Sequence, residues 1–591
     1  MTKVGTTSRA KATARFSRSS LCYTGLFFFK LACTPLFAYL TEPMPWSLPE
    51  RHVQVWDSFD VFNNATFEYL REHLNGQTMS NSSDLHFDSS TNTYAMRRRL
   101  EFPLEAVPTA LQSSYLIRFQ AAMFFGHGMQ VFVNDFLSQD ASARRKSRLH
   151  RCQRGYYFGA VSNDACLWLE PVLNGTASDE YEVYYGILVW ESVVWSWCKL
   201  AFRCLLTLFI MRVMWQRYCR HYFPLLRGLE EIGINGKFSR YEVIVGDPTY
   251  LILSDPLVGL VMLTDTLVAP AYVSWSLLRI SQYKDIPALT LGLFYFTRQV
   301  WCGYFVMRVL SYVVKARQWE SKFAPVDPGA LGIGFFLFAG PLISLTANTP
   351  MMKTYSIMWT WLLPSALEFQ GIEGATGVIT GMLPTGFFPV YLSFALQKLH
   401  SSRQRRLRGL LGQISKQWTY IKDRCRCAQR VQSMVTIITP GNVRRPPNEP
   451  SENEQRNQHS HRAFNDVKNQ FFFALMRWHA PEPPEKIGGS LHALYNDRPE
   501  YRSMPLFSCR AADCFILCYT PDGQVHLQVR LSFLDCLDTR THDPELAIQT
   551  CSSEHNTSYA TCNGETCSTF QPTSPGQVCI HRTRLGVKWV A

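Results

Sequence analysis

Long apolar stretches alternate along the chain with polar stretches rich in Asn, Ser and Arg. A helix needs about 20 mostly apolar residues to cross the hydrocarbon core of a bilayer, and several stretches reach that length. The pattern predicts an α-helical polytopic membrane protein of about six spans. The expected spans cover residues 21–40, 183–211, 257–280, 286–314, 329–346 and 374–396.

The first stretch, Leu21–Leu40, follows a segment with five basic residues and no acid. Such a flank keeps the N-terminus in the cytoplasm. We therefore expect residues 1–20 to be cytoplasmic and residues 21–40 to be a signal-anchor helix. A cleaved signal peptide and a mitochondrial presequence are the two alternatives.

A seventh apolar stretch, residues 355–367, has only 13 residues and is expected to be interfacial or re-entrant. If it crossed the membrane, the basic run that begins at Lys398 would lie on the exterior side, against the positive-inside rule. Six spans with both termini in the cytoplasm are therefore preferred, and seven spans are the alternative.

The polar region 41–182 is too long for a loop and is predicted to be a β-rich ectodomain. Apolar and polar residues alternate over 53–61 and 115–121, which is typical of half-buried strands. The region contains two cysteines, Cys152 and Cys166, which are expected to form one disulfide bond. Its Asn-X-Ser/Thr sequons predict glycosylation at Asn64, Asn81 and Asn174.

The C-terminal third divides into three parts. Residues 397–430 have the pattern of a basic amphipathic juxtamembrane helix on the anionic inner leaflet. Residues 440–462 have the composition of a disordered linker, and residues 463–591 are predicted to be a small α+β cytoplasmic domain with strands at 514–519 and 525–533. The basic side chains expected to contact lipid are Arg403, Arg405, Arg406, Arg408, Lys416 and Lys422.

The region 463–591 contains eight cysteines. Their spacing fits zinc ligands poorly, so reduced thiols in the cytosol are preferred and no metal or cofactor is predicted. The sequon at Asn556 favours the opposite placement, because an exterior domain could carry both a glycan and disulfide bonds. The seven-span alternative would produce that placement.

Charges within apolar spans are costly, so each is a candidate for function. Asp265 and Arg298 lie 16 and 13 residues from the edges of the expected 281–285 turn, which places them at similar depth and predicts an ion pair. A structural pair is preferred over part of an ion or proton route. Lys199 and Arg203 are expected to extend to the membrane interface, and Glu191 needs no special role.

The composition agrees with a membrane protein, since only 18% of the 591 residues are charged, against about a quarter in soluble domains. The net charge of +13 gathers beside the expected spans and does not indicate nucleic-acid binding. No phosphate-binding loop, HExxH or GxSxG motif is present. We expect a non-enzymatic receptor or scaffold, most simply in the plasma membrane, that links an exterior ligand or partner to the cytoplasmic domain. An ion channel or transporter that uses Asp265 and Arg298 is the alternative.

Overall fold

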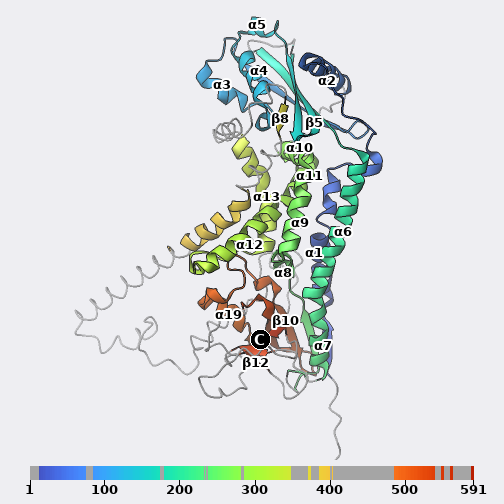
Figure 1. The fold of residues 1–591 in the computed structure, drawn as a ribbon. Coiled ribbons are helices and arrows are strands. Elements are labelled where there is room, and N and C mark those ends of the chain that lie inside the picture. Colours follow the sequence, from blue (N-terminus) through green and yellow to red (C-terminus); the bar gives the residue numbers. More distant parts are fainter. Residues whose placement is uncertain are drawn as a thin grey trace, which may run out of the picture.

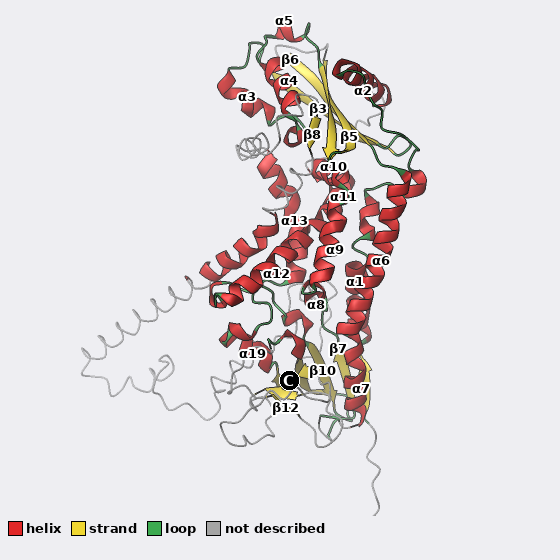
Figure 2. Cartoon of the chain, in the orientation of Figure 1, coloured by secondary structure: helices red, strands yellow, loops and turns green. Residues whose placement is uncertain are grey.

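The computed structural model has two β-sheets at opposite ends of an elongated chain, with a layer of helices between them (Figures 1 and 2). It describes residues 12–74, 84–172, 179–231, 233–234, 237–280, 285–347, 371–373, 385–399, 402, 485–538, 548–550, 560–562 and 588–591.

The first sheet has six strands in the order β2-β3-β6-β5-β4-β8. Neighbouring strands are antiparallel except for β4 and β8, which are parallel. The short strand β8 follows α13 in the sequence, so the chain returns to this sheet after passing through the helical layer. The strands are β2 (Leu85–Asp88), β3 (Thr93–Phe102), β4 (His150–Tyr157), β5 (Ala160–Pro171), β6 (Asp179–Val189) and β8 (Gly371–Glu373).

Helices cover both faces of the six-stranded sheet. On one face α2 packs with Trp168 and Tyr184. On the other face α4 packs with Leu167 and Tyr185, because successive residues of a strand point to opposite faces. The helices of this region are α2 (Phe59–His73), α3 (Thr109–Leu116), α4 (His127–Leu137) and α5 (Ala141–Arg144).

The strands predicted at residues 53–61 and 115–121 are wrong. Phe59 begins α2, and the Ser58 hydroxyl caps that helix by accepting a hydrogen bond from the Val61 amide at 3.4 Å. Residue 115 belongs to α3. Short alternating runs do not distinguish a strand from one side of a helix, and the strands of this region lie elsewhere.

The second sheet has eight strands and combines three distant parts of the chain. Strand β1, near the N-terminus, is parallel to β7, and β7 is antiparallel to β10. The strands predicted at 514–519 and 525–533 form β10 and β11 with those bounds. The strands are β1 (Thr13–Phe16), β7 (Arg240–Ile244), β9 (Glu485–Gly488), β10 (Cys514–Tyr519), β11 (Val525–Phe533), β12 (Ile548–Thr550), β13 (Ala560–Cys562) and β14 (Trp589–Val590).

Between the sheets, α1 lies beside the long helix α6, and α9 to α13 lie to one side of this pair, on its left in the view (Figure 1). Local caps define several starts: Ser192 caps α6, Asp255 caps α9 and Asp285 caps α11. The helices are α1 (Arg18–Ala32), η1 (Leu36–Leu40), η2 (Pro45–Ser47), α6 (Val193–Arg217), α7 (Tyr222–Glu231), α8 (Thr249–Leu253), α9 (Pro256–Leu267), α10 (Pro270–Ile280), α11 (Ile286–Phe296), η5 (Thr297–Gln299), α12 (Val300–Ala316), α13 (Pro328–Ala347) and a helix over 385–399, with α19 (Ser490–Asp497) near the second sheet.

The prediction of a six-span membrane protein is wrong. Among the described residues, a single helical stretch, Val193–Glu231, is both long and apolar enough to cross a bilayer. At most two more spans are possible, each only if a helix pair bent by 81° or 79° counts as one span. The length of an apolar stretch does not show whether its helix is broken. Pro35 follows α1, and Pro270 begins a new helix within the expected span 257–280.

Other expected spans also differ from the structure. The first part of 183–211 belongs to β6, and 286–314 is divided into α11 and α12 by η5. The stretch 355–367, residues 374–384 and nearly all of 397–484 lie outside the described residues. The juxtamembrane helix and the linker therefore remain predictions.

Candidate functional site

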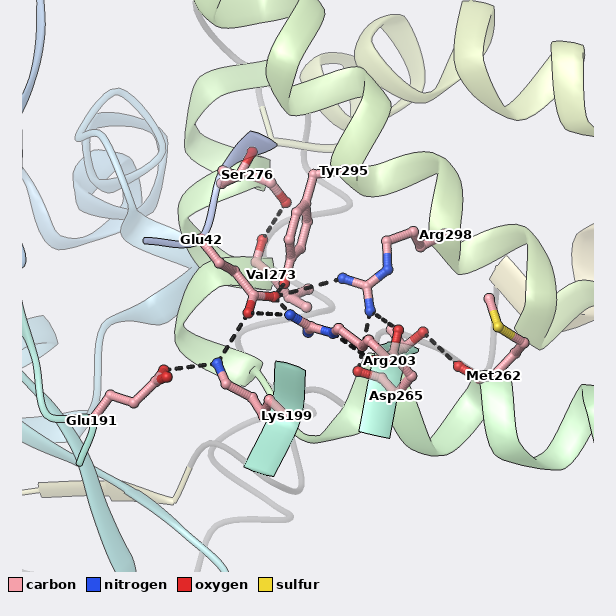
Figure 3. Close-up of polar contacts among 12 residues, drawn as sticks. Glu42, Glu191, Lys199, Arg203, Met262, Asp265, Val273, Ser276, Tyr295 and Arg298 are labelled. Atoms are coloured by element: carbon pink, nitrogen blue, oxygen red, sulfur yellow. Dashed lines mark hydrogen bonds and ion pairs between the residues drawn. The ribbon is translucent and has the colours of Figure 1, made fainter. Parts of the chain in front are cut away.

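A cluster of charged side chains lies buried inside the helical layer (Figure 3). Glu42 follows η1, Asp265 belongs to α9 and Arg298 belongs to η5. Lys199 and Arg203 are four residues apart on α6, so they lie on the same face of that helix. Four segments that are far apart in the sequence therefore meet at one ionic cluster.

Glu42 is the centre of this ionic cluster. Its two carboxylate oxygens accept hydrogen bonds from Arg203 Nη1 and Nη2 at 2.7 and 2.8 Å, which is a bidentate pair. Lys199 Nζ donates to the same carboxylate at 3.0 Å, and the Tyr295 hydroxyl donates at 2.7 Å. Arg298 Nη1 lies 3.7 Å from Oε1. This glutamate therefore has three cationic neighbours.

Asp265 is the second acid of the cluster, and it is shared between two arginines. Its Oδ1 accepts a hydrogen bond from Arg203 Nε at 2.8 Å, and its Oδ2 contacts Arg298 Nη2. Arg298 Nη2 also donates to the Asp265 carbonyl oxygen at 3.2 Å. The structure thus brings together Asp265 and Arg298, which the residue counts about the 281–285 turn predicted to pair. Arg203 lies between Asp265 and Glu42 and contacts both carboxylates.

Lys199 connects the ionic cluster to the six-stranded sheet. Its Nζ donates at 2.8 Å to Glu191, which lies in the short link between β6 and α6. The same ammonium lies 5.0 Å from the centre of the Tyr272 ring. A displacement of the end of β6 would therefore move Glu191 and disturb its contact with Lys199. Through Lys199 it would also disturb the contact with Glu42.

The charges of the cluster balance. Three carboxylates (Glu42, Glu191 and Asp265) face three cations (Lys199, Arg203 and Arg298). Buried charges are tolerated when they are paired and hydrogen-bonded. Within the described residues no group of three metal-ligating side chains is present. The arrangement is suited to holding helices in one register, since each carboxylate already has a cationic partner.

The sequence did not single out Glu42. It is the first acid in the chain, and it follows directly on an apolar run, which is a signal that could have drawn attention to it. The expectation that Lys199 and Arg203 extend to the membrane interface is wrong. Their side chains are 2% and 0% exposed because both turn inward to Glu42.

The other predicted site residues lie apart from the cluster. Cys152 and Cys166 form a disulfide bond between paired positions of β4 and β5. Asn64 is exposed on α2, while Asn81, Asn174 and Asn556 lie outside the described residues, as do Arg403, Arg405, Arg406, Arg408, Lys416 and Lys422. Of the C-terminal cysteines, Cys509, Cys514 and Cys536 carry buried free thiols.

His150 of β4 is partly buried and lies beside Asn64. Its ring stacks on Phe67 with the centroids 3.9 Å apart, and its Nε2 lies 3.3 Å from Asn64 Oδ1. Burial, with Arg148 and Arg71 nearby, lowers the pKa of His150 to about 4. The native state therefore disfavours the protonated ring.

This environment makes a pH-dependent contribution to stability. An unfolded histidine has a pKa near 6.5, so the unfolded chain binds a proton that the native chain excludes between about pH 6.5 and about pH 4. The contribution is present above that window and is lost as the pH falls through it. His150→Gln is expected to flatten this part of the pH dependence, measured as the free energy of unfolding across the window. His52→Gln, at an exposed position, is the control, and an equal slope in the His150→Gln variant would contradict the prediction.

No protein-family model, curated protein or solved structure matches the chain.

Proposed function

We propose that this chain is an integral membrane protein whose helix α6 crosses the bilayer, and that it acts as a non-enzymatic receptor or scaffold. It would link an exterior ligand or partner, bound by the six-stranded-sheet region, to cytoplasmic proteins bound by the second sheet. The observation that carries this proposal is the orientation of the side chains on α6.

Over its first two thirds, helix α6 exposes apolar side chains and buries its charged ones. Lys199 and Arg203 are 3% and 0% exposed, whereas Leu205 and Leu208 are 67% and 60% exposed. A helix on the surface of a water-soluble protein has the reverse arrangement. Charged residues of membrane helices face the protein interior, so the arrangement of α6 suits a lipid environment.

Both α1 and α6 also expose several large apolar side chains. We call this set of side chains the apolar wall; it consists of Leu21, Leu26, Phe29, Val194, Trp195, Trp197, Leu205, Leu208 and Trp215. By contrast, the described residues of β7, β10 and β11 expose no large hydrophobic side chain. Large exposed apolar patches mark surfaces that contact protein or membrane, and this one lies on the helices between the sheets.

The ionic cluster favours mechanical coupling between β6 and the helices over the conduction of ions or protons. An ion or proton route needs a group that can exchange its partner, and Glu42 and Asp265 are each held by two arginines. A rigid, charge-balanced cluster instead transmits a displacement from β6 through Lys199 to the other helices. The proposed exterior side would carry the glycan at Asn64, which glycosidase treatment of the wild type and of Asn64→Gln tests.

Cysteine accessibility tests the proposed membrane position. In membranes that contain the full chain, Leu205→Cys is expected to react with a water-soluble maleimide much more slowly than Asp522→Cys, because a thiolate forms poorly in hydrocarbon. Asp522 is an exposed residue of the turn between β10 and β11, and the wild type supplies the background from the native cysteines. Equal labelling of the two variants would overturn the proposal that α6 lies in lipid.

A flux assay separates the receptor or scaffold from the alternative. Liposomes that contain the purified wild-type chain are expected to leak ions and small solutes no faster than protein-free liposomes. A flux that depends on the chain would overturn the receptor or scaffold and favour a channel or transporter.

A further inference from the structure

The helix over 385–399 packs against α12 and exposes an apolar side. Gly386 lies against α12, where an added Cβ would stand 2.9 Å from Cys302 and from Val306. Five large apolar side chains of this helix are between 37% and 70% exposed, and a period of 3.6 residues places them on one side of it. We call them the apolar stripe; it consists of Phe387, Phe388, Tyr391, Phe394 and Leu399.

Two exposed lysines lie over aromatic rings beside the last turns of this helix. Lys398 lies on the same side as the stripe, and its Nζ is 4.7 Å from the centre of the Phe394 ring. The Nζ of Lys322 is 4.6 Å from the centre of the Trp319 ring, which is 39% exposed. We call Lys322 and Lys398 the lysine pair.

Contacts on both sides of Lys322 hold the lysine pair on one patch. Immediately before it, the Ser321 carbonyl oxygen accepts a hydrogen bond from Gln397 Nε2 at 2.9 Å. Immediately after it, the centre of the Phe323 ring lies 5.8 Å from that of Phe394, the ring that the other lysine covers. The residues that flank Lys322 therefore contact the last two turns of the helix that carries the apolar stripe.

The segment that carries Lys322 also contacts the C-terminal part of the chain on both sides. Before it, Lys315 Nζ of α12 donates at 2.9 Å to the Glu500 carbonyl oxygen. After it, Val326 forms a β-bridge with Phe507. The lysine pair therefore lies on the side of the helical layer that faces the second sheet.

The lysine pair has no acidic partner within the described part of the chain. The nearest acid along the chain, Glu320, is only 6% exposed. An ammonium group on the face of an aromatic ring still has N–H donors for another acceptor. The patch therefore offers donors for an anion directly beside an exposed apolar surface.

We infer that the lysine pair binds the phosphate of an anionic lipid headgroup while the apolar stripe contacts acyl chains of the same leaflet. This inference rests on the proposal that the chain lies in a bilayer, and it adds a membrane contact separate from α6. A lipid is the occupant that supplies apolar chains and a phosphate side by side. Exposed apolar side chains joined to basic residues suit the boundary between headgroups and acyl chains, where tryptophan is also enriched.

Photolabelling of the full chain in bilayers tests the inference. The bilayers contain phosphatidylcholine and a phosphatidylserine that carries a diazirine in its acyl chain, and mass spectrometry locates the labelled peptides. The wild type is expected to be labelled at the apolar stripe. K322Q/K398Q is expected to lower that labelling by about fivefold or more, since each lysine near an anionic surface contributes up to about a fivefold preference for it.

A control variant and an internal reference make the result specific. R98Q/K146Q removes the same charge from exposed positions of the six-stranded-sheet region and is expected to keep the wild-type labelling. The peptide that contains Leu205 of the apolar wall is expected to be labelled equally in all three proteins.

Each other outcome has a defined meaning. Equal labelling of the apolar stripe in K322Q/K398Q and the wild type would overturn the role of the lysine pair. Labelling at Leu205 without labelling of the stripe, as when another protein segment covers it, would overturn the inference and leave α6 in the bilayer. Loss of the labelling on adding inorganic phosphate, at constant ionic strength, would show a site for a free anion and overturn a lipid site. Absence of label at both places would instead refute the proposed membrane position.

Discussion

Replacement of Glu42 by glutamine is expected to lower the free energy of unfolding by about 3–5 kcal/mol, the range for breaking a buried ion pair from one side. The variant keeps the volume of the side chain and removes its charge. Three buried cations would then face two carboxylates, and Arg203 would lose its bidentate partner. Equilibrium unfolding of the purified chain in mixed detergent micelles measures the change.

Two further variants make this result specific to the ionic cluster. Glu50→Gln removes the same charge from an exposed position eight residues along the chain, and the expected change is within about 0.5 kcal/mol. The double variant Glu42→Gln/Lys199→Met restores the charge balance and is expected to regain part of the lost stability. If Glu42→Gln were as stable as Glu50→Gln, Glu42 would not be the centre of the cluster.

The sequence predicted features that depend on a local pattern. The runs on either side of the turn residues Pro521, Asp522 and Gly523 predicted two strands, and these form β10 and β11. Residue counts about the 281–285 turn predicted that Asp265 and Arg298 would meet. In both cases the two partners are joined by a short connection, so their separation could be counted along the chain.

Features that depend on distant contacts were not predicted. The pairing of Thr13 with Arg240 in the second sheet has no local signal. The position of Glu42 depends on the break after α1 at Pro35, which turns the following residues into the helical layer. The length of an apolar stretch does not reveal this break or the one before Pro270. The six-span prediction was wrong for that reason. Lys199 and Arg203 were predicted to extend to the membrane interface because the sequence does not show that Glu42 is their partner.

A double-mutant cycle on Asp265 and Arg298 should give a coupling energy of about 2–3 kcal/mol, at the upper end for contacting residues. Asp265→Asn and Arg298→Met are each expected to be destabilising by about 3–5 kcal/mol, because each leaves a buried charge without its partner. The double variant removes one charge of each sign, while Arg203 keeps Glu42. It is therefore expected to be more stable than the sum of the single changes predicts.

The surface pair Arg71 and Glu170 provides the matched cycle. Their closest charged atoms are 3.6 Å apart, and the two side chains are 60% and 40% exposed, so a coupling energy below about 1 kcal/mol is expected. The contrast matters for function, because a strongly coupled Asp265–Arg298 pair keeps α9 and η5 in fixed register. Harmless single changes at Asp265 and Arg298 would mean that the pair does not hold these segments together, and the argument against an ion route would then lose its basis.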